Sequence, residues 1–354
     1  MQSDIIINAS SKLYVTYFLL DRIGMKTIRT KSIFRWISLL VLSVLALSLC
    51  LLDCSAEEHT VLIFILGSDL ETDSGSVTDD LMEITRATKD IPVRVIAYLG
   101  GSMVWWMPEL ENSRCYVLEI EQGTRKIIQD YGEQTSSNAA RFGSFLKQYG
   151  HNGDDLILWG HGLPGGKGIG YDSIAGNDTL TLSEIQEGLR KSSLKLRLIG
   201  FDACNMATLE AAWSVLPYSE YFAASPEVEA LSGWNYRNVL SHLSLQDNNA
   251  PEALKQDFVK TGRREIRRKP LTVLRLSDLK VYADSVIRVL DTTPAYSESV
   301  TLNELAESCW DREAGEMIMK LLGNQMLLIS GREEGDQFIL PDIQEAYNAF
   351  INRK

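Results

Sequence analysis

The chain has 354 residues, of which 45% are hydrophobic and 23% are charged, a balance typical of a folded globular protein rather than a disordered one. This length allows one large domain or two ordinary ones. The 47 acidic and 35 basic residues leave a net charge of -12, which argues against a nucleic-acid partner, because binding phosphate requires clustered Lys and Arg. An acidic protein can, however, attract basic peptides.

An apolar segment near the N-terminus has the features of a secretory leader. Ile37–Leu52 follows a basic region, Lys26–Arg35, and the small residue Ala56 comes shortly after it. The segment is shorter than the about 20 residues that a membrane-spanning helix needs. We therefore predict a signal peptide at residues 1–56, with translation starting at Met25 and cleavage after Ala56. The alternative is an uncleaved anchor, and either reading predicts a protein that is secreted or held in the cell envelope.

Short apolar runs recur after the leader and predict the strands of a mainly parallel sheet that is buried on both faces. These runs are Thr60–Leu66, Val93–Leu99, Asp155–Trp159, Leu196–Phe201, Tyr221–Ala224 and Leu271–Leu276, and Cys115–Glu121 adds a hairpin strand. Helical patterns separate them at Thr78–Lys89, Ser137–Tyr149 and Leu182–Leu189. Alternating strands and helices predict an α/β three-layer sandwich with right-handed crossovers.

The character of the chain changes after about residue 250, where helical patterns dominate. The predicted helices are Ala250–Ile266, Ser277–Leu290, Leu302–Glu307, Glu313–Leu328 and Pro341–Phe350. We therefore predict a core domain at residues 57–250 and a mainly helical C-terminal lobe at residues 251–354 that packs on it.

Cysteines and histidines are few and form no recognisable metal pattern. No two cysteines have the CxxC spacing and no HExxH segment occurs, so the sequence predicts no metal site and no required cofactor. Outside the leader the cysteines are Cys115, Cys204 and Cys309, too scattered for a disulfide framework.

Two reactive residues follow predicted strands directly. His161 ends the segment DLILWGH, and Cys204 ends LRLIGFDAC. Because the carboxyl ends of parallel strands meet at one edge of a sheet, we expect these side chains to face one site. An imidazole beside a thiol can stabilise the reactive thiolate and later protonate a leaving amine. Either residue alone is more often structural, so the prediction rests on their joint placement.

Glycines surround the predicted histidine. Gly160 and Gly162 allow the backbone to approach a substrate closely, and the backbone amides of Gly162 and Cys204 are candidate donors to a tetrahedral oxyanion. The glycine-rich segment after His161 is not a nucleotide-binding loop, because no Ser or Thr follows Lys167.

These segments together resemble the clostripain family of cysteine peptidases, which belongs to the wider group of caspase-like folds with the gingipains and legumain. The resemblance runs over about residues 60–245 and 272–279. It is carried by GSDLETDSGSVTDDLMEI, LILWGHG, LTLSEIQEGL, GFDACNMATLEAA, ASPEVEALSGWNY and TVLRLSDL. Asn205 and the pair Ala230-Leu231 depart from the family's usual residues, which affects the expected rim of the substrate site more than the reactive pair.

The resemblance implies a caspase-like fold and a cysteine endopeptidase that cleaves peptide bonds after Arg or Lys. His161 and Cys204 would form the catalytic dyad and act through a thioester acyl-enzyme. Asp202 lies two residues before Cys204, where a carboxylate could receive a basic P1 side chain; alternatively, it holds loop amides. Glu227, Glu229 and Trp234 are further candidates for substrate binding, and core packing is the alternative for Trp234.

Two other functions stay open at this stage. A catalytically silent binding protein of the cell envelope could keep the fold, although the presence of both His161 and Cys204 argues against it. A peptidase could also prefer Asn or Asp at P1, as relatives of the wider fold do. The expected partners are peptides or proteins with basic residues, with membrane contact only through an uncleaved leader. Calcium is suggested by the resemblance alone, and Lys167 is the expected position for any self-cleavage between the two motifs.

Overall fold

The computed structural model describes residues 59–245, 247, 250–257, 271–292, 300–308, 311–322 and 328–329. The chain divides into two compact units, Met1–Glu58 and His59–Lys354, and all described residues lie in the second. The predicted leader at residues 1–56 and the predicted helix Pro341–Phe350 lie outside the described residues.

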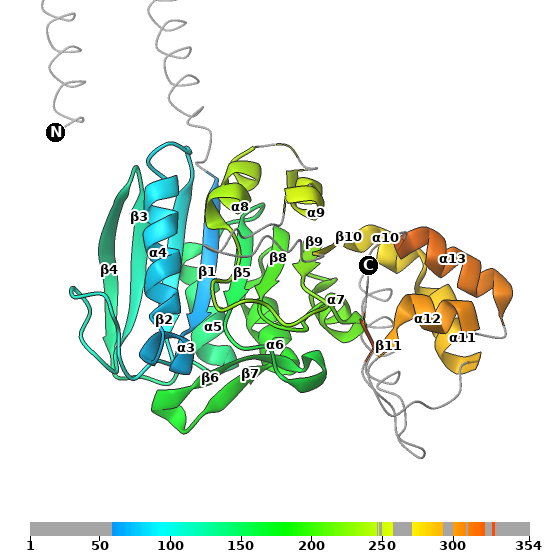
Figure 1. The fold of residues 1–354 in the computed structure, drawn as a ribbon, viewed down its shortest axis with the longest axis horizontal. Coiled ribbons are helices and arrows are strands. Elements are labelled where there is room, and N and C mark those ends of the chain that lie inside the picture. The colour runs from blue at the N-terminus through cyan, green and yellow to red at the C-terminus, as the bar shows by residue number, and fades with distance from the viewer. Residues whose placement is uncertain are drawn as a thin grey trace, which may run out of the picture. The chain divides into compact units, whose positions relative to one another are not determined.

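An eight-stranded sheet forms the centre of this unit (Figure 1), with the strand order β10-β9-β8-β5-β1-β2-β3-β4. The strands are β1 (Thr60–Leu66), β2 (Arg94–Gly100), β3 (Cys115–Glu121), β4 (Thr124–Gly132), β5 (Asp155–Trp159), β8 (Leu196–Asp202), β9 (Ser219–Ala224) and β10 (Thr272–Arg275). The five strands from β9 to β2 are parallel, and the outer strands β10, β3 and β4 pair antiparallel. The predicted mainly parallel sheet is therefore confirmed.

Strand β1 shows why the sheet needs a helical layer on each side. All seven of its residues are buried, and they alternate between two hydrophobic cores: Leu62, Phe64 and Leu66 face one core, and Val61, Ile63 and Ile65 face the other. Successive strand side chains point to opposite faces, so a strand that is apolar throughout requires cover on both faces.

Two helical layers supply this cover (Figure 1). The layer over Val61 contains α4 (Ser76–Ala87), α8 (Tyr236–Leu243) and α9 (Leu254–Asp257). The layer over Leu62 contains α5 (Ala139–Tyr149), α6 (Leu182–Ser192), α7 (Leu209–Val215) and α10 (Leu276–Val281). The described tail adds α11 (Ala283–Thr292), α12 (Leu302–Ser308) and α13 (Arg312–Leu322), with a two-stranded sheet of β11 (Val300–Thr301) and β12 (Leu328–Ile329).

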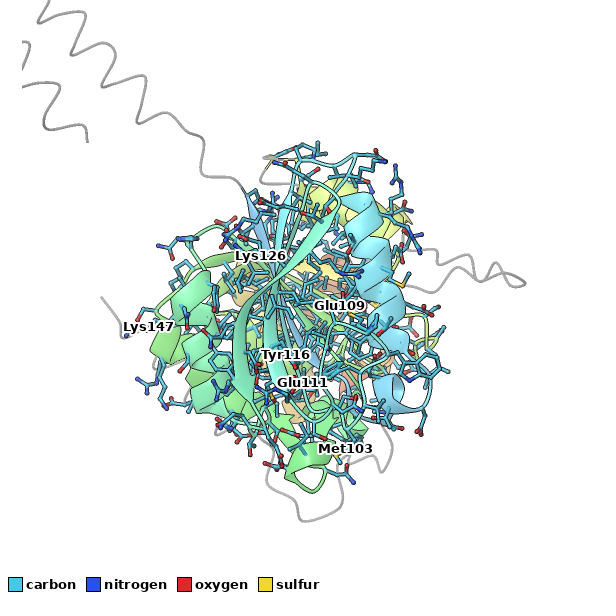
Figure 2. The ribbon with its side chains drawn as sticks, turned by 90° about the vertical axis from the view of Figure 1, so that its left-hand side faces the viewer. Met103, Glu109, Glu111, Tyr116, Lys126 and Lys147 are labelled. Carbon is cyan, nitrogen blue, oxygen red and sulfur yellow. The ribbon has the colours of Figure 1, made fainter. Side chains whose placement is uncertain are left out.

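The β3–β4 hairpin ends the sheet on one side, and Figure 2 views this edge with Tyr116 and Lys126 labelled. Strand β4 is largely exposed and carries charged residues such as Arg125 and Lys126, and register shifts interrupt its pairing with β3. Charges and irregularities protect an edge strand from pairing with another chain. Strand β4 was not predicted from the sequence, because none of its residues is buried and it therefore shows no alternating apolar pattern.

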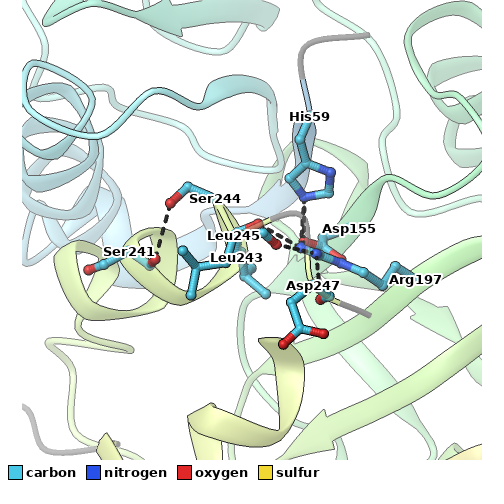
Figure 3. A network of polar contacts seen from close by, with 8 residues as sticks. All are labelled: His59, Asp155, Arg197, Ser241, Leu243, Ser244, Leu245 and Asp247. Carbon is cyan, nitrogen blue, oxygen red and sulfur yellow. Dashed lines mark hydrogen bonds and ion pairs between the residues drawn. The ribbon is translucent and has the colours of Figure 1, made fainter. Parts of the chain in front are cut away.

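A polar network ties the beginnings of three central strands to the end of α8 (Figure 3). Arg197 of β8 forms an ion pair with Asp155 of β5 and donates to the carbonyl oxygens of Leu243 and Leu245, at 2.6 and 2.8 Å. The Nε2 atom of His59, directly before β1, lies 2.7 Å from Asp155. The network lies at the amino ends of the parallel strands, so it leaves their carboxyl ends free for a site.

Candidate active site

His161 and Cys204 lie just past the carboxyl ends of two adjacent parallel strands. The register pairs Trp159 of β5 with Asp202 of β8, and each reactive residue lies two positions further along its chain. The connection is tight here, because Gly160 donates to the Asp202 carbonyl oxygen at 3.2 Å. A Cβ atom on Gly162 would lie only 1.7 Å from the Cys204 carbonyl oxygen. The two loops therefore run against each other, and only glycine fits at position 162.

His161 is held both by its backbone and by its side chain. The His161 carbonyl oxygen accepts from Gly170 at 2.7 Å, which fixes the residue to the small hairpin of β6 (Gly168–Asp172) and β7 (Asp178–Thr181). On its side chain, Nε2 lies 2.9 Å from Oδ1 of Asp69, and the ring centre lies 5.4 Å from that of Tyr171. Sequence reasoning missed the Asp69 contact, although Asp69 belongs to the GSDLET segment that it singled out.

Cys204 is a half-buried free cysteine. Its sulfur accepts a hydrogen bond from the Glu229 backbone amide, with N and Sγ 3.2 Å apart. The next residue, Asn205, has φ of 56°, a left-handed conformation that Asn tolerates better than most residues. No direct hydrogen bond joins the described side chains of His161 and Cys204, so the two lie on facing loops with separate partners.

The backbone amides of Gly162 and Cys204 are both free to bind a ligand. Gly162 lies opposite Ile169 in an isolated antiparallel bridge, whose hydrogen bonds come from the flanking residues Leu163 and Gly170. Among the described residues, neither the Gly162 amide nor the Cys204 amide has a protein acceptor. Unpaired amides beside a thiol are an arrangement that could bind an oxyanion.

Three buried carboxyl groups lie beneath the Cys204 loop, and we call Asp80, Asp202 and Glu229 the acidic cluster. Oδ2 of Asp202 accepts from the Trp234 amide and the Tyr236 hydroxyl, both at 3.0 Å. Asp80 Oδ2 accepts from the Trp159 indole at 2.9 Å. A Cβ atom on Gly233 would lie 2.9 Å from an oxygen of Asp80 and from one of Asp202, so both carboxylates converge on this glycine.

Burial in the acidic cluster alters its protonation. Burial, followed by the nearby charge of Asp202, raises the pKa of Glu229 well above its ordinary value. Its Oε1 accepts from the Trp234 indole at 3.1 Å. No donor among the described residues reaches its buried Oε2, and the protonated acid can share a hydrogen bond with Asp202. Burial also raises the pKa of Tyr236, together with the charges of Asp202 and Asp80, so the tyrosine hydroxyl stays a donor to Asp202.

The other two predicted substrate residues lie in different environments. Glu227 is exposed, and its backbone carbonyl accepts from Asn205 at 3.0 Å, which places it on the segment beside Cys204. Trp234 is fully buried and packs over Gly200, where a Cβ atom would lie 2.8 Å from its ring. Its ring therefore fills the core, while its two N–H groups hold Asp202 and Glu229.

The described residues were also considered as metal ligands and as membrane-spanning helices. Within the described residues, no group of three or more His, Cys, Asp or Glu side chains is arranged to hold a metal ion. No helix in that part of the chain has the length and apolar character needed to cross a membrane.

Comparisons with known proteins identify the family and support the fold. The family model of the clostripain family matches residues 63–349, whereas no curated protein matched the sequence. Two solved structures of secreted cysteine proteases from Bacteroides thetaiotaomicron, one with an irreversible peptide inhibitor and one called iotapain, each cover 83% of this chain and 99% of their own. They have TM-scores of 0.60 and 0.62 and identities of 16% and 14%, respectively.

A third solved structure, an inactive zymogen from Parabacteroides distasonis, is 15% identical with a TM-score of 0.57. It covers 82% of this chain and 96% of its own. These neighbours share the fold, which confirms the predicted caspase-like three-layer sandwich. Since the family model spans most of the sequence, the chain belongs to the clostripain family, a family of cysteine endopeptidases.

Proposed function

We propose that this endopeptidase cleaves peptide bonds after Arg or Lys, with Cys204 as nucleophile and His161 as its acid/base partner. One observation carries the proposal. Trp159 ends β5, Asp202 ends β8, and the two are paired in the sheet; His161 and Cys204 each lie two positions further along the chain. Because the strands are parallel neighbours, the two side chains emerge at the same edge of the sheet.

The proposed reaction has two stages. The Cys204 sulfur attacks the carbonyl carbon of the substrate, and the thiol proton passes to His161; the amides of Gly162 and Cys204 donate to the oxyanion. His161 then protonates the nitrogen as the C–N bond breaks, which releases the amine and leaves a thioester on Cys204. In the second stage His161 takes a proton from water, whose oxygen attacks the thioester. The C–S bond then breaks, and the departing Cys204 thiolate takes the proton back from His161. The products are the carboxylic acid and the free thiol.

The acidic cluster supports a basic P1 side chain over Asn or Asp. Asp202 is two residues from the nucleophile and almost fully buried, and Glu229 and Asp80 lie close to it. A guanidinium or ammonium group would satisfy the unpartnered Glu229 oxygen and neutralise the cluster. An Asp side chain would instead be repelled. Trp234 acts by holding the carboxyl groups in place, and Glu227 lies where it could meet a residue beside P1.

The cell compartment follows from the leader. A signal peptide at residues 1–56 would send the enzyme out of the cytoplasm, and its substrates would then be extracellular or envelope proteins with basic residues. Calcium has no role in this proposal, because each chemical step uses groups of the chain itself.

A panel of fluorogenic peptides that differ only at P1 tests the proposal on residues 57–354. We expect cleavage after Arg or Lys, and no turnover by Cys204→Ala or His161→Ala. The double variant should be little worse than either single one, because the pair acts as a unit. Turnover by Cys204→Ala at the wild-type rate would overturn the assignment. An intact chain that binds the peptides without cleaving them would instead indicate the silent binding protein.

Asp202→Asn tests the P1 assignment. Loss of the charge should lower kcat/KM for Arg substrates about tenfold or more, because hydrogen bonds between charged groups are worth about 1.5–3 kcal/mol. Asp73→Asn is the matched control, since it removes the same charge at an exposed position that the proposed P1 site does not include. An unchanged preference for Arg over Gln at P1 in Asp202→Asn would show that another group receives the basic side chain.

A further inference from the structure

The contact between His161 and Asp69 carries an inference beyond the Cys204–His161 pair, and it rests on the proposed function. We infer that Asp69 is a positioning residue for His161, which makes the site a triad in which a carboxylate orients the imidazole and stabilises its charged form. Nothing in the Cys204–His161 pairing requires this third group.

The contact fixes which ring nitrogen exchanges protons. An ionised carboxylate only accepts hydrogen bonds, so the His161 Nε2 atom, 2.9 Å from Asp69 Oδ1, carries the proton of that bond. The neutral imidazole then has its lone pair on Nδ1, which is the nitrogen left to take the Cys204 proton. When Nδ1 is protonated, the ring carries a positive charge next to Asp69. The carboxylate stays ionised throughout, as the orienting acid of such triads does.

The chain before Asp69 is built to aim this carboxylate. Ser68 is fully buried and has φ of 46°, a left-handed conformation that costs energy for a residue with a side chain. Its hydroxyl donates to the same Oδ1 atom of Asp69 at 2.9 Å, and its backbone amide donates to the Gly101 carbonyl oxygen at 3.1 Å. Strained residues of this kind persist where the surroundings fix them, and they cluster at functional sites.

The short helix that carries Asp69 is fixed by a buried carboxylate. The helix α3 (Ser68–Thr72) has only five residues, too few to be stable alone. Glu71 is fully buried, and it accepts from the Thr78 hydroxyl at 2.6 Å, the Thr78 amide at 3.0 Å and the Trp106 amide at 2.8 Å. Three hydrogen bonds to one buried carboxylate hold α3 between α4 and the loop after β2, so Asp69 is presented from a rigid support.

The charge of Asp69 fits this role. Burial raises the pKa of Asp69, but hydrogen bonds from His161 and Ser68 and the charge of His161 lower it further, so the net pKa is below its ordinary value. Asp69 is therefore ionised at neutral pH. Besides Asp69 on α3, His161 is faced by the ring of Tyr171 on β6 and by the Cys204 loop that packs against Gly162.

Asp69→Asn tests the inference, and Asp73→Asn is a matched control. Asp73 is exposed at the end of the same helix and loses the same charge. We expect Asp69→Asn to lower kcat about 10- to 100-fold with little change in KM, because the ring loses the carboxylate that orients it and stabilises its charged form. Asp73→Asn should leave both unchanged. Wild-type kcat or a higher kcat in Asp69→Asn would overturn the inference.

A second readout separates this inference from the proposed function. In the inactive Cys204→Ala chain, nitrogen NMR can show which ring nitrogen of the neutral His161 carries the proton, with His161→Gln identifying its signals. The form protonated at Nε2 should dominate, because Nε2 faces Asp69, and Asp69→Asn should reduce its share, whereas Asp73→Asn should not. An unchanged share would refute the orienting contact even in an active peptidase, and a reduced share would support it even if peptide cleavage were absent.

Discussion

Glu229 has an unusual environment for a carboxyl group. Carboxyl groups are seldom fully buried unless they are paired with a cation, yet one Glu229 oxygen is buried without a donor and its nearest charge is that of Asp202. The raised pKa means that the folded chain keeps this group protonated in a pH range where the unfolded chain has already lost the proton. The folded state then binds more protons than the unfolded state, so stability falls as the pH rises through that range.

Glu229→Gln should remove this loss of stability, because Gln mimics the protonated acid and cannot ionise. We expect the free energy of unfolding of the wild type to decrease as the pH rises above 4.5, the ordinary Glu value, and that of Glu229→Gln to decrease less. Urea unfolding at a series of pH values measures this difference. Glu227→Gln, at an exposed position, is the control and should follow the wild type. Parallel curves for Glu229→Gln and wild type would contradict the protonated state.

The position of a site side chain could be predicted only where it directly follows a predicted strand. The positions of His161 and Cys204 followed from two apolar runs, because such runs in an α/β alternation become parallel strands with a common carboxyl edge. The contact of Asp69 with His161 and the approach of Asp80 to Asp202 join residues that are distant in sequence. Charged residues in loops carry no periodic pattern, so only the folded chain identifies these partners.

The same difference applies to whole elements. Strand β5 was predicted at its observed bounds, Asp155–Trp159, because it is a short run of buried residues. The strands β4, β6 and β7 and the helix α3 were missed, since they are short or largely polar and owe their structure to tertiary contacts. Beyond the predicted boundary at residue 250, the strand β10 completes one edge of the central sheet. The loops that follow β5 and β8 pack closely at Gly162, and this contact could not be predicted from the sequence.

Gly162→Ala should disable the site while leaving the sheet intact. The added Cβ atom would lie 1.7 Å from the Cys204 carbonyl oxygen, so the His161 and Cys204 loops must move apart. A misplacement of about 1 Å at reacting groups can cost 100-fold in rate, and we expect a loss of kcat of at least about that size. Gly176→Ala is the control: a Cβ atom there meets nothing within 4 Å, but alanine is strained at its φ of 69°, so this variant should lose stability and keep kcat. Near-wild-type kcat in Gly162→Ala, measured with circular dichroism as a check on folding, would show that the loops are not in close contact.

On the scale of the whole molecule, a buried polar network and the proposed active site lie at opposite ends of the sheet. The network of His59, Asp155 and Arg197 lies at the amino ends of the strands, and His161 and Cys204 follow their carboxyl ends. Arg197 is buried and spends its donors on Asp155 and on carbonyl oxygens that end α8. The two ends can therefore be perturbed separately.

Arg197→Met should destabilise the fold without changing the chemistry. It leaves the buried Asp155 without its guanidinium partner, and breaking a buried pair in this way costs about 3–5 kcal/mol. The melting temperature should fall by about 5 °C or more, while kcat of the folded fraction stays at the wild-type value. Arg190→Met removes an exposed ion pair with Glu187 and should barely change the melting temperature. Equal melting temperatures for the two variants would mean that the network contributes nothing to stability.

Self-cleavage between the two reactive residues would need a basic residue in a segment that can open. Five basic residues lie there: Lys167, Arg190, Lys191, Lys195 and Arg197. Arg190 and Lys191 pair with Glu187 on α6, Lys195 donates to the Pro217 carbonyl oxygen, and Arg197 is buried in the network. Lys167 is exposed and was the expected cleavage position. Hydrogen bonds to Leu182 and Leu163, however, fix the backbone on both sides of the bond that follows it.

The bond between Lys167 and Gly168 should therefore resist self-cleavage, and the chain should be active uncut. The Lys167 carbonyl oxygen accepts from Leu182 and the Gly168 carbonyl oxygen accepts from Leu163, both at 2.9 Å, so a protease must first break both bonds to straighten this segment. Wild type and Cys204→Ala, each expressed as residues 57–354, should show the same intact mass, and Lys167→Ala should keep wild-type activity. The opposite outcome would be that wild type becomes active only as it is cut after Lys167, while Cys204→Ala stays whole. This result would show that the hairpin opens and that processing is part of the mechanism.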